Sequence, residues 1–381
     1  MKKKITLVLS LFIIISSYSQ TYQFKTIKEI DALPVISQDN TGTCWSFSSI
    51  SFLESEILRL TGKKMDLSEM YNVKYTYLAK AENYVMRQGK AQFGEGGLNH
   101  DVINSAKKYG IVYESSYTGK LKGTDKFDHS KLVAELEKVV KRAVELTPAK
   151  YTSWKNDYIA ILDNHMGKFE NETTFFSNTT SKEKNSITSI KKISPKQILE
   201  NSTLQLDDYV TITSFTHEPF YRPFVLNVPD NFSNGSMYNV TLDEFIQNID
   251  NAIDNGFTLA LDTDVSEPTF SAKKGIAVLP ENAKDVNEIL TSIKLEMRVT
   301  AELRQREFET YATTDDHLMH IVGKVQDQNG NIYYKVKNSW GKDSGKDGYI
   351  YMSVPYIRMK AISVMVHKDG LTKITRKNLK L

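Results

Sequence analysis

The segment after Cys44 carries apolar residues at the spacing of one helix face. They are Phe47, Ile50, Leu53, Ile57 and Leu60, and Gly62 follows as a stop signal. The pattern predicts an amphipathic helix whose first residues adjoin Cys44. Similar periodicity predicts further helices over about 66–88, 99–109, 129–147 and 150–165.

Residues 166–192 interrupt this pattern because they are polar and only weakly periodic. They indicate a surface excursion, which we extend to about residue 205. Near its end, the stretch SPKQILEN predicts a short helix with Pro195 close to its start.

From about residue 208 the chain changes to short runs rich in β-branched and aromatic residues, separated by turn residues. These runs are DYVTITSF, GFTLALDTD, HLMHIVGKV, IYYKVKNS, GYIYMSV and AISVMVH. Helices predicted over about 241–255 and 284–292 lie between them. A helical first half and a β-rich second half predict an α+β fold with two lobes. We place the helical lobe at about 20–165 and the β-rich lobe at about 206–381.

The first twenty residues have the three parts of a secretory signal peptide. Lys2 to Lys4 form the charged part, Ile5 to Ile15 the apolar run, and Ser16 to Ser19 the small-residue end. Because the run is shorter than the ~20 residues needed to span a bilayer, we expect cleavage near Ser19/Gln20. The sequence then predicts an exported protein, periplasmic or secreted, that is not bound to the membrane. An uncleaved anchor is the alternative.

Charge gives no reason to expect a nucleic acid partner. The predicted signal holds three of the 49 basic residues and none of the 46 acidic residues, so the remaining chain carries 46 of each sign. A balanced chain has no overall attraction for nucleic acid or an anionic membrane. The acidic pairs Asp207–Asp208 and Asp315–Asp316 show no metal-ligand grouping, so we expect neither a metal nor another cofactor.

The chain has one cysteine, Cys44, and therefore no intrachain disulfide. A buried structural thiol is one interpretation. A reactive thiol is the other, since the N-terminus of the predicted helix favours a thiolate. A catalytic thiol also needs a base, a group that orients the base, and oxyanion donors. His317 at the start of an apolar run, Asn338 at the end of the next, and Gln38 six residues before Cys44 are the candidates.

Four motifs resemble the papain-type cysteine peptidases and occur in that family's order. They are QDNTGTCWSFSS, EGGLNHDVINSAKKYGIVYESSY, DHLMHIVG and KNSWGKDSGKDGYIYMS. The stretch DDYVTITSFTHEPFYRPFVLNVPDN is similar to the bleomycin hydrolase and aminopeptidase C branch. The resemblance implies a papain-like two-lobed fold with its active site in the cleft between the lobes. It also implies an aminopeptidase that acts on peptide substrates, and, more weakly, a hexamer.

By this resemblance Cys44 is the nucleophile, His317 is the general base and acid, and Asn338 orients the imidazole. Gln38 completes the oxyanion hole with the backbone N–H of Cys44. Trp340 shields the hydrogen bond between Asn338 and His317 from water.

Gly96 and Gly97 match the glycines whose backbone pairs with an extended substrate, where a missing side chain permits close approach. Two residues depart from the papain signature. Thr41 stands where that signature has a disulfide cysteine, and Glu95 stands where its partner would be.

His320 is a rival for the role of His317. Residues three apart on a strand face opposite sides, so only one of the two can face the thiol. The spacing from His317 to Gly323, the glycine expected to end this strand, fits the family and favours His317.

The resemblance also implies that the C-terminal tail lies in the cleft, where the carboxylate of Leu381 would hold the substrate's amino group. A solvated basic tail is the alternative. Three further readings stay open: an endopeptidase with an open cleft, a non-catalytic peptide-binding relic, and acyl transfer of the transglutaminase type.

Overall fold

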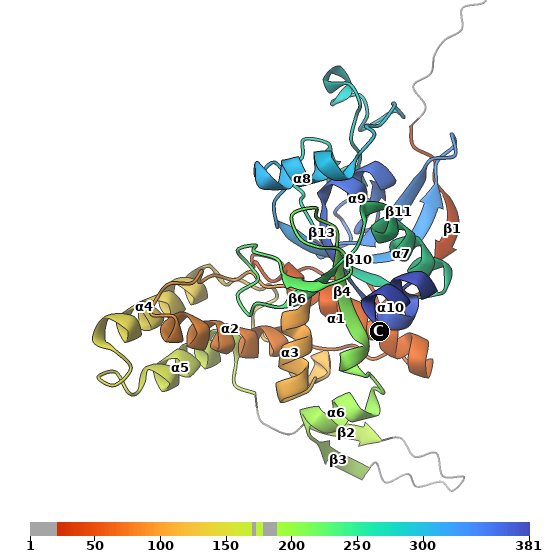
Figure 1. Ribbon diagram of the computed structural model, residues 1–381. Coiled ribbons are helices and arrows are strands. Elements are labelled where there is room, and N and C mark those ends of the chain that lie inside the picture. The colour runs from red at the N-terminus through yellow and green to blue at the C-terminus, as the bar shows by residue number, and fades with distance from the viewer. Residues whose placement is uncertain (1–20, 170–172, 178–188) are drawn as a thin grey trace, which may run out of the picture.

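The computed structural model describes residues 21–169, 173–177 and 189–381 (Figure 1). One lobe is helical and the other is built on a large β-sheet, with α1 at their junction. The helices of the first lobe are α1 (Cys44–Thr61), α2 (Glu69–Met86), α3 (Asn99–Tyr109), α4 (Ser130–Leu146), α5 (Trp154–Met166) and α6 (Pro195–Asn201). In this lobe α2 contacts α3, α4 and α5, and α4 packs along α5.

The sheet of the second lobe runs in the order β5-β6-β4-β13-β7-β10-β11-β12-β9-β8, and β1 pairs with β10. The central strands are β4 (Tyr209–Thr213), β13 (Ala361–His367), β7 (Leu259–Thr263), β10 (His317–Gln326), β11 (Ile332–Lys337) and β12 (Tyr349–Ser353). The shorter strands are β1 (Lys25–Glu29), β5 (Pro223–Val225), β6 (Ser236–Asn239), β8 (Phe270–Ser271) and β9 (Ile276–Ala277). A separate hairpin pairs β2 (Thr173–Ser177) with β3 (Ser189–Ile193).

Strand β10 changes its neighbour along its length. Its first half pairs with β7, and its second half pairs with β1 from Gly323 onward. A Cβ atom at Gly323 would lie 2.5 Å from the carbonyl oxygen of Lys28, so a glycine is needed where the two strands meet. The strand continues to Gln326, three residues beyond the expected end.

Helices of the second lobe cover the sheet. They are α7 (Leu242–Asp254), α8 (Ala301–Glu309), α9 (Val354–Lys360) and α10 (Lys373–Leu379). Phe245 and Ile249 of α7 are fully buried in a core that includes Ile321 and Val336 of the central strands. A second core fills the helical lobe and reaches the sheet through Leu318 and Met365.

Most predicted elements are present, and each predicted β-rich run contains a strand. The helix predicted over 284–292 is wrong, because only a 3₁₀ turn at Ala283–Asp285 and further turns occupy it. In that segment Ile289 is buried while its neighbours stay largely exposed, so no continuous apolar face forms. The sequence analysis missed α8, α9 and α10 and the shorter strands β1, β2, β3, β5, β6, β8 and β9.

Two predictions concern parts of the chain that are only partly described. The predicted signal peptide lies outside the described residues. In the predicted surface excursion, α6 is attached to the helical lobe, since the backbone N–H of Ile111 donates to the carbonyl of Pro195 over 3.2 Å. None of the described helices is both long and apolar enough to cross a membrane.

Candidate active site

Helix α1 begins at Cys44. The carbonyl of Thr43 accepts hydrogen bonds from the backbone N–H groups of Ser46 and Phe47, at 2.9 and 3.3 Å, which closes the first turn. Ser48 Oγ donates to the carbonyl of Met319 over 2.7 Å and ties this turn to β10. The sole cysteine therefore lies at a helix N-terminus, against the strand that begins with His317.

His317 and Asn338 meet because β10 and β11 are antiparallel neighbours. His317 Nε2 lies 2.7 Å from Asn338 Oδ1, and the backbone N–H of Ser339 donates to the same oxygen over 2.8 Å. An amide oxygen only accepts, so Nε2 carries the proton and Nδ1 remains the basic nitrogen of the ring. The Trp340 ring lies over the imidazole, with 4.6 Å between the ring centroids.

The thiol and the imidazole are both buried, which opposes a charge on either. Burial raises the pKa of the Cys44 thiol to about 12, although the backbone N–H of Leu318 acts in the opposite direction. Burial lowers the pKa of His317 to about 4, and the Asn338 hydrogen bond partly counteracts this. The structure thus sets desolvation against the thiolate that the helix N-terminus favours.

Gln38 is held beside Asn338 by pairing between two loop segments. Its backbone N–H donates to the carbonyl of Ser339 over 2.8 Å. Ser339 Oγ donates to Gln38 Oε1 over 2.6 Å, and Gln38 Nε2 donates to the carbonyl of Thr41 over 2.6 Å. The second proton on Nε2 is left available to another acceptor.

Comparison with known proteins places this geometry in a family. The sequence model described as "Peptidase C1-like family" matches residues 14–380. The chain belongs to this family. The match confirms the resemblance to papain-type cysteine peptidases, and the two lobes confirm the predicted α+β fold.

Relatives of this C1-like peptidase match it over most of their length. Aminopeptidase G of Lactobacillus delbrueckii subsp. lactis is 24% identical over 370 residues, which cover 89% of this chain and 82% of the relative. Aminopeptidase C of Listeria innocua is 22% identical over 376 residues, covering 91% and 82%. The solved structure of PepW from Lactobacillus rhamnosis superposes with a TM-score of 0.73 at 18% identity, covering 93% and 84% of the two chains, and this likeness concerns the fold.

The C1-like peptidase replaces the papain-type disulfide beside the nucleophile with a carboxylate contact. The backbone N–H of Gly42 donates to Glu95 Oε2 over 2.6 Å, and the Trp45 indole N–H donates to the carbonyl of Glu95 over 2.9 Å. A Cβ atom at Gly42 would lie 2.9 Å from the Glu95 Cβ atom, so the two segments touch closely. Glu95 therefore ties its own segment to the loop of Thr41 and Cys44. These are the two segments that a disulfide joins in the papain signature.

The two predicted substrate-binding glycines have different surroundings. A Cβ atom at Gly97 would press on the Trp45 indole at 3.1 Å. At Gly96 the carboxylate of Asp230 lies so close that a Cβ atom there would be 2.0 Å from Oδ2. The carbonyl of Gly96 accepts a hydrogen bond from the Lys80 ammonium. The pairing of Gly96 with an extended substrate stays a prediction, and the Gly96 carbonyl is already in a hydrogen bond.

Three carboxylates near Cys44 were missed by the sequence analysis. Asp230, Asp262 and Asp315 each raise the pKa of the Cys44 thiol. They come from a loop, from β7 and from the residue two before His317, so no local motif joins them. The one signal in the sequence was Asp262. It directly follows the run FTLAL, where a strand predicted to lie inside the sheet would be expected to carry an apolar residue.

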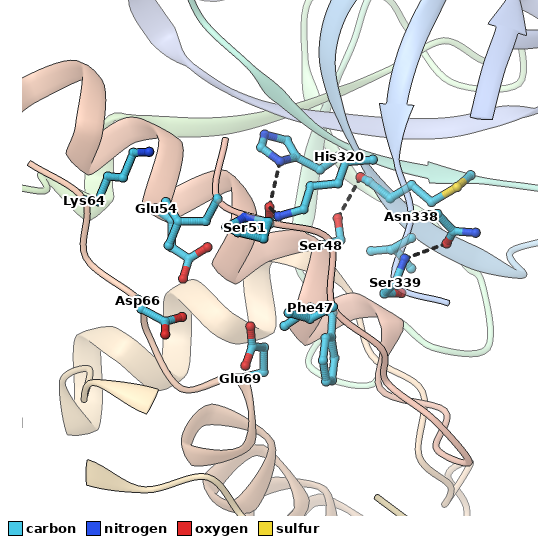
Figure 2. Close-up of a pocket in the computed structure, with 16 residues that line it drawn as sticks. Phe47, Ser48, Ser51, Glu54, Lys64, Asp66, Glu69, His320, Asn338 and Ser339 are labelled. Carbon is cyan, nitrogen blue, oxygen red and sulfur yellow. Dashed lines mark hydrogen bonds between the residues drawn. The ribbon is translucent and has the colours of Figure 1, made fainter. Parts of the chain in front are cut away.

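His320 lies in a separate polar network. Lys337 Nζ donates to Ser51 Oγ over 2.7 Å, and Ser51 Oγ lies 3.0 Å from His320 Nδ1. His320 and Ser51 line a cavity of about 430 Å³, together with Glu54 and Glu69. Figure 2 shows these four side chains. Burial lowers the pKa of His320 well below its usual value, so the ring is neutral.

The C-terminal tail occupies neither predicted position. It forms α10, in which Thr372 caps the first turn and Leu379 is only 5% exposed. Asn248 Nδ2 of α7 donates to Thr375 Oγ1 over 2.9 Å, and the backbone N–H of Leu381 donates to the carbonyl of Arg376. The tail is a packed helix on the β-rich lobe because Leu379 anchors it in the core beside α7.

Within residues 21–169, 173–177 and 189–381, no group of three or more His, Cys, Asp or Glu side chains is arranged to hold a metal ion.

Proposed function

We propose that this C1-like peptidase is a cysteine aminopeptidase that removes residues from the N-terminus of peptides. Its relatives include proteins named aminopeptidase G and aminopeptidase C. The proposal rests on what lies against the backbone of Gly96. An endopeptidase must leave this backbone free for the peptide that precedes the cleaved bond, whereas here the Lys80 ammonium already uses the Gly96 carbonyl and the Asp230 carboxylate fills the side where a Cβ atom would lie.

The proposed reaction begins at Cys44. His317 Nδ1 takes the thiol proton as the sulfur forms a bond to the substrate's carbonyl carbon. The carbonyl electrons move to oxygen, which accepts hydrogen bonds from Gln38 Nε2 and from the backbone N–H of Cys44. Asn338 keeps the imidazole oriented while it carries the proton.

The carbon–nitrogen bond then breaks, and the imidazolium gives its proton to the leaving amine. The first residue remains on Cys44 as a thioester. A water molecule attacks the carbonyl carbon of this thioester while His317 Nδ1 takes a proton from the water. The carbon–sulfur bond then breaks, and Cys44 leaves as a thiolate. Proton transfer from His317 restores the thiol, and the released amino acid carries the new carboxylate.

The test compares matched substrates on purified protein under reducing conditions. L-Alanyl 4-nitroanilide has a free amine, and N-acetyl-L-alanyl 4-nitroanilide does not. We expect kcat/KM to be at least about 100-fold higher for the free amine, since one charge-assisted contact is worth roughly that factor. Equal or faster cleavage of the acetylated substrate would favour an open-cleft endopeptidase.

We also propose that the chain is exported and loses its first residues near Ser19/Gln20. Tyr22 supports this position, because its hydroxyl donates to the carbonyl of Ile289 over 2.7 Å and holds the chain just beyond that point. N-terminal sequencing of protein recovered from the source cells would find a start near residue 20. The hexamer implied by the resemblance stays a prediction, which sedimentation velocity can test.

A further inference from the structure

Three carboxylates converge beside the reaction centre from separate parts of the chain. Asp262 on β7 is paired in register with Leu318, the residue after His317. Asp315 precedes His317 by two residues, and its charge acts on Asp262. Asp230 comes from the loop between β5 and β6 and lies against Gly96.

The carboxyl groups of Asp262 and Asp315 are shielded from solvent and lie against each other. Asp262 is 0% exposed. Asp262 Oδ1 and both carboxylate oxygens of Asp315 accept no side-chain donor from the described basic residues. The two carboxyl groups can hold one proton between them, and the backbone N–H of Asp230 favours the charged form of Asp315. Asp262 Oδ2 has one long contact, with Ser363 Oγ at 3.4 Å. Burying carboxylate oxygens without donors is costly, so this arrangement calls for a cationic or donor-rich ligand.

The protein supplies too little positive charge to neutralise this group. Lys80 acts on Asp230 and Asp315, and Arg304 acts on Asp262, through charge alone and without a direct ion pair among the described residues. Lys80 is the nearest cation whose charge acts on Asp230, and its ammonium is already used by the carbonyl of Gly96. Acidic groups whose oxygens lack a basic partner therefore remain near enough to act on the thiol.

The position of these acidic groups suits the α-nitrogen of a substrate's first residue. In such a residue the nitrogen is two bonds, about 2.5 Å, from the carbonyl carbon that the thiol attacks. The nitrogen must therefore lie close to Cys44, on the side where a longer peptide would pair with Gly96. An α-ammonium presents three N–H donors there, which suits the oxygens of Asp262 and Asp315 that lack a basic partner and the carboxylate of Asp230 beside Gly96.

We propose that Asp230, Asp262 and Asp315 form a buried acidic subsite that binds the α-ammonium of the substrate's first residue. The inference rests on the proposed aminopeptidase function and gives it a source of selectivity within the cleft. In this arrangement the internal carboxylates supply the counter-charge, and the C-terminal carboxylate is not required. A peptide with a preceding residue is disfavoured because its amide cannot neutralise the subsite.

The test uses Asp262→Asn, Asp315→Asn and the double variant, which keep side-chain volume and remove charge. Each is assayed with L-alanyl 4-nitroanilide and its N-acetyl counterpart. We expect KM for the free amine to rise about 10- to 100-fold in a single variant, with a smaller change in kcat. Cleavage of the acetylated substrate should stay the same or increase.

Asp316→Asn is the matched control, because Asp316 is the exposed neighbour of Asp315 and bonds the backbone N–H of Val265 instead. A thermal melt measures how much of each variant is folded, and titration of Cys44 with iodoacetamide measures how much free thiol each preparation contains. If folded variants lose activity equally on both substrates, or keep the wild-type preference, the acidic subsite is wrong. If the wild type itself shows no preference for the free amine, the proposed aminopeptidase function is wrong as well.

Discussion

His317 Nε2 donates to Asn338 Oδ1 over 2.7 Å, and this contact fixes which nitrogen of the ring can act as a base. The Asn338 oxygen also accepts from the backbone N–H of Ser339, so the amide cannot turn without losing two hydrogen bonds. Trp340 covers the imidazole from outside while remaining 36% exposed. The base is therefore oriented before any substrate arrives.

Substitutions of His317 and Asn338 should lower kcat by different factors. His317→Ala should remove nearly all kcat because no other group can carry the proton. Asn338→Ala should lower kcat by about 10- to 100-fold, since general base catalysis survives with poorer orientation. Steady-state kinetics with L-alanyl 4-nitroanilide would check both. A wild-type kcat in folded Asn338→Ala would show that the contact does not orient the base.

Gln38→Ala should lower kcat by about 100-fold with little change in KM, the usual scale for one oxyanion donor. The side chain is also tied to Ser339 and Thr41, so its loss could loosen the loop. Ser339→Ala is the matched control because it removes the contact to Gln38 Oε1 and keeps the amide donor. A similar loss of kcat in both variants would mean that Gln38 acts by holding the loop.

His320→Ala should lower stability and leave the chemistry nearly intact. It removes a fully buried ring that contacts Ser51 and packs edge-on against Phe52, so we expect about 2–4 kcal/mol of destabilisation. Thermal melting measures the loss, and kcat per titrated thiol measures the chemistry. A folded variant with a large loss of kcat would reverse the assignments of His317 and His320.

Asp315→Asn should make Cys44 react at lower pH. The Asp315 charge raises the pKa of the thiol, so removing it lowers that pKa. Burial raises the pKa of Asp315 itself to about 7, so the wild type carries this charge only above about pH 7. The alkylation rates of the variant and the wild type should converge below that pH and separate above it. Asp316→Asn should match the wild type well above pH 7 and shift only the pH at which Asp315 ionises, because the Asp316 charge raises the pKa of Asp315. An Asp315→Asn profile unchanged above pH 7 would contradict the prediction.

Deletion of the chain from Asn378 onward should affect stability rather than selectivity. The deletion removes Leu379, which is 5% exposed in the core beside α7, at a cost of about 2–4 kcal/mol. The preference for free-amine over acetylated substrates should stay within about twofold, because α10 packs away from the thiol. A large rise in cleavage of the acetylated substrate would instead restore a role for the tail in the cleft.

The sequence allowed much of the fold to be predicted where one face of an element is continuously apolar. The helix over 99–109 and the strand AISVMVH have the predicted bounds, because both bury such a face. Helix α10 was missed because Leu379 alone provides most of its burial among basic neighbours. The candidate catalytic residues could be proposed from the sequence because their motifs are local. The acidic subsite was missed because it exists only after β7 and β10 pair.

The contacts of Glu95 hold the loop of Cys44 in place without a disulfide, so reductants and oxidants do not affect them. The loop that carries the nucleophile is held by a carboxylate and two N–H donors, from Gly42 and Trp45, and none of these groups can be reduced. A reductant strong enough to keep Cys44 as a thiol therefore leaves the supports of that loop unchanged. Since Cys44 is the only cysteine, oxidation cannot produce a mispaired isomer of the chain. Loss of activity in air should thus come from oxidation of Cys44 alone. Thiols should restore the activity until Cys44 is oxidised beyond the sulfenic acid.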